Sequence, residues 1–180
     1  MKTELSDGRI LIRPLRADDV DAMFEAVFES IAEIAPWLPW CHPNYSRDEA
    51  AAFILSRPDA LKAEEEYSFA VIDAETNAFL GGVGLNLIIR KYQMGNLGYW
   101  VRTSRTKRGI ASAATRLAAR FGLRELGLQR VEIIAAINNR ASQRAAEKAG
   151  ARREGVLRKR LLVNDQPQDA VLYSLVAEDL

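Results

Sequence analysis

The pattern of apolar and polar residues predicts three strands in the first half of the chain, over residues 10–14, 67–73 and 79–89. In the third, Val83, Leu85 and Leu87 alternate with Gly84, Asn86 and Ile88. Residues 73–78, which join the last two strands, have the composition of a turn. Strands 67–73 and 79–89 are therefore expected to pair.

Helical spacing of apolar residues occurs twice between these strands. The first predicted helix follows Asp18 or Asp19, either of which can serve as its N-cap. A second helix is predicted over 47–56, capped by Ser46, and Pro36 and Pro39 interrupt the stretch before it. The inward faces of the two helices are expected to comprise Val20, Met23, Phe24, Val27, Ala50, Phe53 and Ile54.

From Leu97 onward the pattern alternates strand, helix, strand and helix, which favours parallel pairing through crossover helices. The first of these helices is weakened or ended by Gly122 and Gly127 and has Ile110, Ala114, Leu117 and Phe121 on one face. The later predicted elements are a strand at 130–137, a helix at 142–148 ended by Gly150, strands near 153–161 and 170–176, and a turn at 164–167.

Together these elements predict a single α/β domain (mixed α+β) over residues 1–180. Its core is expected to be a mixed, mostly antiparallel central sheet of about six to seven strands, flanked by helices on both faces. A length of 180 residues is enough for one well-buried domain and short for two. No low-complexity linker divides the chain.

Composition indicates a soluble globular protein, with 48% hydrophobic and 27% charged residues. No apolar run approaches the length needed to cross a bilayer, and the first residues lack the apolar segment of a signal peptide. One cysteine excludes an internal disulfide, which fits a reducing compartment. A cytoplasmic protein with no membrane partner is expected.

The net charge of +1 conceals a strong asymmetry along the chain. Residues 101–160 hold 16 lysines and arginines but only 4 glutamates and no aspartate, an excess of 12 positive charges, and the remaining residues carry an excess of 11 negative charges. Such a separation can attract an anionic cofactor to one face and a cationic substrate to another.

A basic turn over residues 102–109 runs from an extended segment into a helix. The first N–H groups of a helix lack intrahelical partners, so they can bind a phosphate, and Gly109 allows a close approach to the main chain. Arg105, Lys107 and Arg108 add positive charge, and Ser112 could contribute a hydroxyl. The segment contains neither a P-loop nor a dinucleotide fingerprint, and a turn before a solvated helix would explain it equally well.

The order of motifs resembles the GNAT superfamily of N-acetyltransferases, and within it the RimJ/RimL-like branch of protein N-terminal acetyltransferases. The central matches are Arg108-Gly-Ile-Ala111, the strand at 130–137, Asn139 with Ser142, and Glu147-Lys-Ala-Gly-Ala151. Flanking matches in the same order are Ile10-Leu-Ile-Arg-Pro-Leu15 with Asp18-Asp19, Pro36-Trp-Leu-Pro-Trp40, Gly98-Tyr-Trp-Val101 and Asp169-Ala-Val-Leu-Tyr-Ser174. The resemblance covers nearly the whole chain and implies a single GNAT-like domain.

The resemblance implies acetyl-CoA as cosubstrate and no metal. In the family, main-chain groups at a splayed junction of the central strands hold the cofactor arm, here on a strand expected over 98–103. The implied cofactor contacts are Val101, Thr103, Lys107, Arg108, Gly109, Ile110, Ala111, Ser112 and Asn139. Thr106 stands where relatives often place Gln or Arg, so the backbone contacts are expected to carry phosphate binding.

For catalysis, the resemblance implies Ser142 as the proton source for the departing thiolate, although a serine at a helix start also commonly caps the helix. Relatives often have a glutamate where this chain has Asn96, which cannot accept a proton near neutrality. Glu29, Glu33 and His42 are the candidate substitutes. A base is also dispensable for an α-amine, whose reference pKa is about 7.7 to 8.0.

The expected acceptor is a protein N-terminus, for example of a ribosomal protein. Trp37 and Trp40 could wall its pocket beside Asn96, or could fill the core. Three alternatives remain at this point: a small amine such as an aminoglycoside or polyamine, a non-catalytic acyl-CoA-binding protein, and nucleic-acid binding through the basic region. The last lacks a recognition motif and is not expected. An exposed edge strand could support a homodimer.

Overall fold

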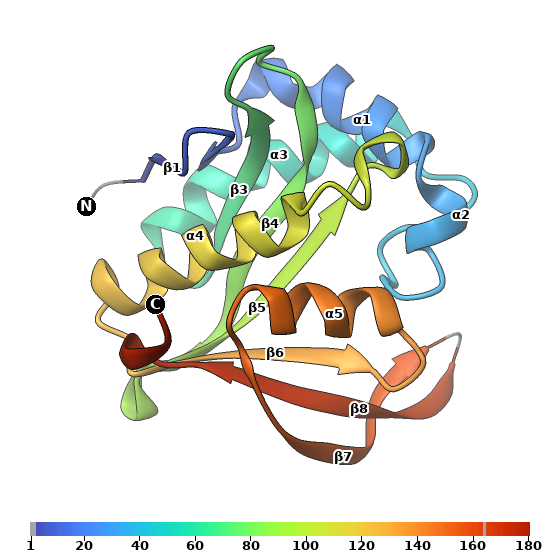
Figure 1. Ribbon diagram of the computed structural model, residues 1–180. Helices are drawn as coiled ribbons and strands as arrows, with labels where there is room; N and C mark the ends of the chain where they lie inside the picture. Colours follow the sequence, from blue (N-terminus) through green and yellow to red (C-terminus); the bar gives the residue numbers. More distant parts are fainter. Residues whose placement is uncertain (1–2, 164) are drawn as a thin grey trace.

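One twisted sheet forms the centre of the computed structural model, which describes residues 3–163 and 165–180 (Figure 1). Within these residues the sheet has eight strands in the order β1-β2-β3-β4-β5-β6-β8-β7. Neighbouring strands are antiparallel except β5 (Met94–Val101) and β6 (Arg130–Ala136). The predicted mixed, mostly antiparallel sheet is confirmed. It exceeds the expected six to seven strands because Leu5–Ser6 (β1) pairs with β2 (Ile10–Pro14).

The other strands follow the alternation seen in the sequence. β3 (Tyr67–Asp73) and β4 (Phe79–Ile89) have the predicted bounds and pair with each other. Their connection is a turn in which the Asp73 N–H donates to the Ala78 carbonyl at 2.9 Å. β7 (Arg152–Val163) and β8 (Gln166–Leu175) form the last hairpin. Asn164 of the predicted turn lies outside the described residues.

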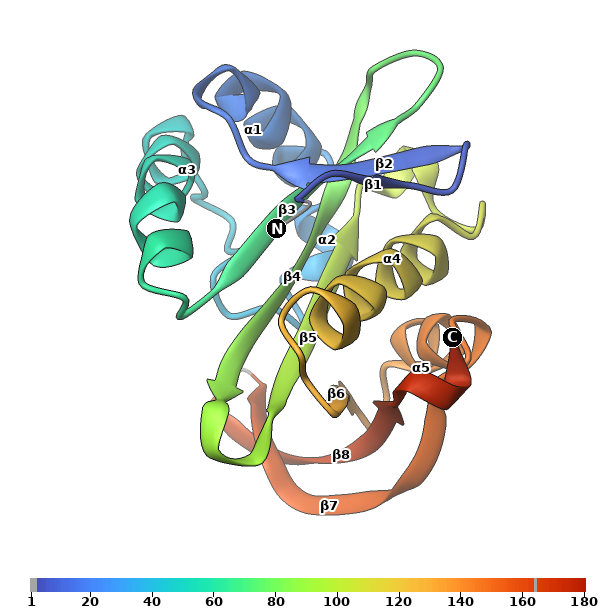
Figure 2. The ribbon, with the colours of Figure 1, turned by 90° about the vertical axis from the view of Figure 1, so that its left-hand side faces the viewer.

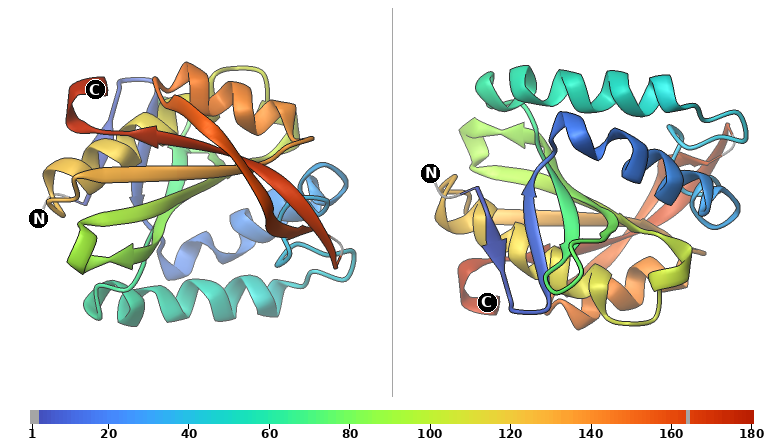
Figure 3. Two further views of the ribbon diagram at one scale, coloured as in Figure 1. Left: turned by 90° about the horizontal axis from the view of Figure 1, so that it is seen from below. Right: turned by 90° about the horizontal axis from the view of Figure 1, so that it is seen from above.

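Helices cover both faces of the sheet, as predicted (Figures 2 and 3). α1 (Val20–Phe28), the short α2 (Ile31–Ile34) and α3 (Arg47–Lys62) lie on one side, and α4 (Ile110–Arg124) and α5 (Arg140–Lys148) on the other. Each layer encloses its own hydrophobic core, one under α4 and one under α1 and α3. None of the helices in the described part of the chain is long and apolar enough to span a bilayer.

Two helix boundaries differ from the prediction. Ser46 caps α3 by accepting from the Glu49 N–H, as expected, but the helix continues through Pro58 to Lys62 instead of ending at residue 56. The extra turn places Leu61 against the core, which offsets the hydrogen bond that the proline removes. α5 likewise begins at Arg140, two residues before the predicted start at 142. α4 ends at Arg124, between the two glycines expected to weaken or end it, and at Gly122 a side chain would come within 2.9 Å of Leu85 on β4.

Neither aspartate before α1 acts as the predicted side-chain N-cap. The helix starts after a 3₁₀ turn at Ala17–Asp19, and no side chain caps it among the described residues. Instead the buried Asp19 carboxylate binds the Arg13 guanidinium through two hydrogen bonds of 2.7 Å and accepts from the Arg16 N–H. The arginine on β2 attracts the carboxylate more strongly than the neutral helix N–H groups do.

The two parallel strands diverge after three paired positions. Met94, Gly95 and Asn96 of β5 face Arg130, Val131 and Glu132 of β6, and beyond them the strands separate, as Figure 1 shows. β5 continues alongside β4 to Val101, and β6 continues alongside β8 to Ala136. A splay therefore opens in the middle of the sheet, next to the beginnings of α4 and α5.

Candidate functional site

The chain enters α4 through a loop with two left-handed residues. Lys107 has a φ of 61° and Gly109, the N-cap, has a φ of 77°. Among the described residues no side chain caps this helix, so the N–H groups of Ile110, Ala111 and Ser112 have no acceptor there. Three oriented donors at the positive end of a 15-residue helix form a site for an anion.

Basic side chains surround this helix end. Lys107 and Arg108 are exposed and, like Arg105, form no ion pair in the described part of the chain. Ser112 donates its hydroxyl proton to the Gly109 carbonyl at 2.9 Å, which leaves the oxygen able to accept. The cofactor-binding residues predicted between 107 and 112 thus lie together at one helix end, beside the splay.

Glu29, at the end of α1, binds the loop that follows β5. Its carboxylate accepts from the Arg102 guanidinium at 2.5 Å and from the Ser104 N–H at 2.8 Å. The hydrogen bond from Arg102 holds the pKa of Glu29 down to about 2, and the Ser104 hydrogen bonds add to the effect. A carboxylate held in this way is a weak proton acceptor near neutral pH.

Ser30 and Glu33 bind the same loop at Thr103. The buried Ser30 hydroxyl accepts from the Thr103 N–H at 2.9 Å, and Glu33 accepts from the Thr103 hydroxyl at 3.0 Å. The predicted strand over 98–103 is too long, because β5 ends at Val101 and Thr103 begins a 3₁₀ turn. The Thr103 N–H therefore holds the loop against Ser30. Val101, in contrast, lies at the end of β5, whose free edge faces the splay.

Across the splay, Tyr99 of β5 reaches the first turn of α5. Its phenol donates to the Ser142 carbonyl at 2.8 Å and lies 3.1 Å from the Ser142 hydroxyl. Burial raises the pKa of Tyr99 to about 12, so the phenol is protonated at neutral pH. Tyr99 was not among the predicted site residues, although its place two residues before Val101 puts both side chains on the same face of β5.

Asn139, and not Ser142, caps α5. The Asn139 side-chain oxygen accepts from the Ser142 N–H at 3.0 Å. Ser142 occupies the third helical position, and its half-buried hydroxyl has only Tyr99 as a partner within the described residues. The helix-capping interpretation of Ser142 therefore does not hold, and its hydroxyl is available for another role.

The opposite face of β5 is open around Gly98. Asn96, Gly98 and Trp100 point to this side, where Asn96 donates to the Asn86 side-chain oxygen at 2.9 Å. Gly98 is exposed, and a side chain built there would meet nothing within 4 Å. We call the surface over Gly98, between Asn96 and Trp100, the Gly98 surface.

Aromatic side chains lie at one end of this surface. Trp40 packs edge-on against Trp100 and Tyr45, with ring centroids 5.9 Å apart in both pairs, and is 41% exposed. Trp40 is thus exposed and does not fill the core. The half-buried Trp37 takes part in neither contact, and sequence reasoning did not single out Trp100.

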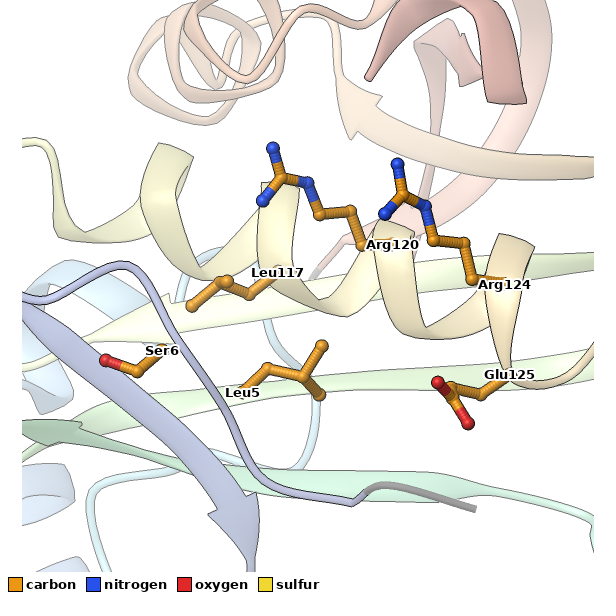
Figure 4. A pocket seen from close by; sticks show the side chains of 6 residues that line it. All are labelled: Leu5, Ser6, Leu117, Arg120, Arg124 and Glu125. Atoms are coloured by element: carbon orange, nitrogen blue, oxygen red, sulfur yellow. The ribbon is translucent and has the colours of Figure 1, made fainter.

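A separate hollow of about 200 Å³ lies between β1 and the second half of α4 (Figure 4). Its lining residues are Leu5, Ser6, Leu117, Arg120, Arg124 and Glu125. None of the predicted site residues lines it, and it lies toward the opposite end of α4 from the free N–H groups.

The sequence is similar to known proteins over most of its length. Residues 9–152 match the family model described as an acetyltransferase (GNAT) domain. The chain is 32% identical over 127 residues to YjcK of Bacillus subtilis, which is provisionally named an N-acetyltransferase. This match covers 70% of each chain. It is 28% identical to YdaF of the same organism, provisionally named a ribosomal N-acetyltransferase, over 94% of this chain and 92% of that one.

A solved structure has the same fold over its whole length. It is that of RimL, the ribosomal L7/L12 α-N-protein acetyltransferase, in complex with coenzyme A. The TM-score is 0.87 at 18% identity, and the match covers 99% of both chains.

Proposed function

Because this chain belongs to the GNAT family of acetyltransferases and is an N-acetyltransferase, we propose that it transfers an acetyl group from acetyl-CoA to the α-amine of a protein N-terminus. The observation that carries the proposal is the set of free N–H groups at the start of α4, beside a splay in the sheet. A cytoplasmic location, where such an acceptor is made, is part of the proposal.

The residues at the splay fit a coenzyme A thioester. Its pyrophosphate requires donors and positive charge, and Ile110, Ala111 and Ser112 offer N–H groups while Lys107 and Arg108 offer cations. The main-chain groups of Leu97–Val101 on the side of β6 are not paired with a strand among the described residues, so they can bind the amides of the cofactor arm.

Acetyl-CoA brings the acetyl group as a thioester, whose carbonyl carbon the amine attacks while coenzyme A leaves as a thiolate. In our proposal the Ser142 hydroxyl donates the proton that the sulfur requires. The Tyr99 phenol, 3.1 Å from that hydroxyl, then returns a proton to Ser142. The proton that the attacking nitrogen loses as the amide forms passes to solvent, and solvent restores the proton of the phenol. Both groups are protonated before transfer, as this direction requires.

The Gly98 surface is the proposed acceptor site. It lies on the opposite face of β5 from Tyr99, with Trp40 and Trp100 at one end and Asn96 at the other. Asn96 orients the acceptor rather than taking a proton, and we assign no base to Glu29, since Arg102 holds its pKa at about 2. An α-amine needs little help, because its reference pKa of about 7.7 to 8.0 leaves part of it neutral. The names of YdaF and RimL support a ribosomal protein as the acceptor.

Thiol release from acetyl-CoA tests the proposal. The purified chain is given peptides with free N-termini, the same peptides with a formylated N-terminus and an internal lysine, and small polyamines or aminoglycosides. We expect release with the free N-termini and none with the formylated controls, and mass spectrometry should locate the acetyl group on the α-nitrogen. Release with polyamines or aminoglycosides alone would replace the acceptor class. Coenzyme A binding without release on any acceptor would favour a non-catalytic binder.

A further inference from the structure

The loop that enters the proposed phosphate site depends on contacts with a distant part of the chain. Residues 102–106 contain a single short 3₁₀ turn, closed by backbone hydrogen bonds to Arg102 and Thr103. Within that turn, the N–H group of Thr103 donates to Ser30 and the N–H group of Ser104 donates to Glu29. These contacts join residues more than 70 positions apart in the sequence.

Glu29 and Ser30, at the corner between α1 and α2, also divide the cations of the basic loop into paired and unpaired ones. Arg102 turns toward α1, where its guanidinium binds Glu29 and also donates to the Phe79 carbonyl at 3.3 Å. Lys107 and Arg108 stay exposed without an acidic partner in the described part of the chain. One arginine is thus used to anchor the loop, while the cations nearest α4 remain available for an anion.

The Ser30 side chain is held in one position by its surroundings. Its side chain is fully buried, and its hydroxyl donates to the Ala26 carbonyl at 2.7 Å while accepting from the Thr103 N–H. Both hydrogen bonds are satisfied, so the hydroxyl cannot rotate without leaving a buried group unpaired. Helix α1 therefore sets the position of the loop main chain.

We infer that Glu29 and Ser30 are positioning residues for the cofactor: they hold residues 102–104 so that the N–H groups at the start of α4 face the phosphates. The inference rests on the proposed function, because it names acetyl-CoA as the ligand of that helix end. Neither residue touches the cofactor in this scheme. They act through Arg102, Thr103 and Ser104.

The test is the affinity for coenzyme A of Glu29→Gln, measured by calorimetry with the full chain. Removing a carboxylate near a basic loop strengthens binding of a polyanion by electrostatics alone, whereas loss of positioning weakens it, so the sign of the effect separates the two. We expect about tenfold weaker binding, the effect of losing one charged hydrogen-bond partner, and a KM for acetyl-CoA that rises far more than kcat falls. Ser30→Ala should weaken binding in the same direction.

The matched control is Glu25→Gln, one helical turn earlier on α1. Glu25 is exposed, and its side chain has no partner among the described residues, so this variant removes the same charge without the loop contacts. We expect unchanged or slightly tighter coenzyme A binding. Equal affinity of Glu29→Gln and Glu25→Gln would overturn the inference.

Hydrogen exchange of the ligand-free protein provides a readout that does not need the cofactor. The amides of Thr103 and Ser104 should exchange faster in Glu29→Gln than in Glu25→Gln while the core of the sheet stays protected. Faster exchange with unchanged coenzyme A affinity also overturns the inference, because the corner would then hold the loop without serving the ligand. If the unmodified chain binds no coenzyme A, the proposed function fails separately.

Discussion

At the scale of single residues, the sequence indicates candidate residues but not the partners of each side chain. Ser142 was predicted from its place in a motif, but Tyr99, whose phenol lies 3.1 Å away, comes from a strand 43 positions earlier. Glu29 was predicted as a possible base, although its partners Arg102 and Ser104 lie 73 and 75 positions away in the sequence. A sequence pattern reveals residue types and local spacing, and it does not reveal which long-range partner a charged group will meet.

The Tyr99–Ser142 pair leads to a prediction about kcat. Ser142→Ala should lower kcat by about 10²-fold, the lower end of the contribution of a positioned proton donor, and Tyr99→Phe by roughly tenfold because Ser142 remains. KM for acetyl-CoA should change little in either variant. Steady-state kinetics measures both effects, with Tyr92→Phe as the control, since Tyr92 is an exposed tyrosine (63%) on the turn before β5. An undiminished kcat in Ser142→Ala would remove it from the reaction.

The same pair restricts the pH profile. Burial raises the pKa of Tyr99 to about 12, so the phenol keeps its proton well above neutral pH. The rate should rise as the acceptor amine loses its proton near its reference pKa of about 7.7 to 8.0. At every pH up to 10, loss of the Tyr99 proton should not lower the rate.

At the scale of elements, strands were predicted more accurately than the ends of helices. β2, β3 and β4 have the predicted bounds because each is a run rich in apolar residues, and the turn-like residues 73–78 separate β3 from β4. β1 has two residues and α2 has four, too few for any period to be read. The last turn of α3 passes a proline because tertiary packing of Leu61 outweighs local preference, which no local pattern reveals.

Replacement by alanine should have opposite effects on stability at two glycines that lie on neighbouring strands. At Gly81 of β4 a side chain would come within 2.2 Å of the Trp100 carbonyl, so Gly81→Ala should destabilise the fold by at least about 2 kcal/mol. At Gly98 a side chain meets nothing, so Gly98→Ala should leave the unfolding free energy within about 0.5 kcal/mol. Urea denaturation measures both.

Gly98 also tests the acceptor site. Because the added methyl group would project from the Gly98 surface, Gly98→Ala should raise KM for the peptide acceptor several-fold and leave KM for acetyl-CoA unchanged. If KM for the peptide stayed the same, the acceptor would not pass over Gly98.

At the scale of the whole molecule, ion pairs link elements that are distant in sequence. Arg130 of β6 binds Glu154 of β7 through two hydrogen bonds, and this pairing holds the pKa of Glu154 down to about 2. Glu29 has a similarly lowered pKa through Arg102. Both carboxylates stabilise the folded chain only while they are ionised.

This linkage predicts a loss of stability in acid. The folded-state pKa of each group is depressed from 4.5 to about 2, so its contribution is present above pH 4.5 and disappears as the pH falls from 4.5 toward 2. After allowance for solvent screening we expect about 1 kcal/mol from each pair. The free energy of unfolding, measured with urea at pH 6 and at pH 3, should differ less between the two pH values in Glu154→Gln than in the unmodified chain. Glu178→Gln, which removes an exposed carboxylate from the last turn, is the control.

The splay between β5 and β6 also has a mechanical consequence. Only three paired positions join these strands, whereas β6 and β8 share six in the described residues. The sheet is therefore two panels that meet at a short hinge, with α4 packed across both. A force that pulls the panels apart should open the molecule there first, and a ligand seated between them would act as a brace. Single-molecule pulling should then give a higher rupture force in the presence of coenzyme A.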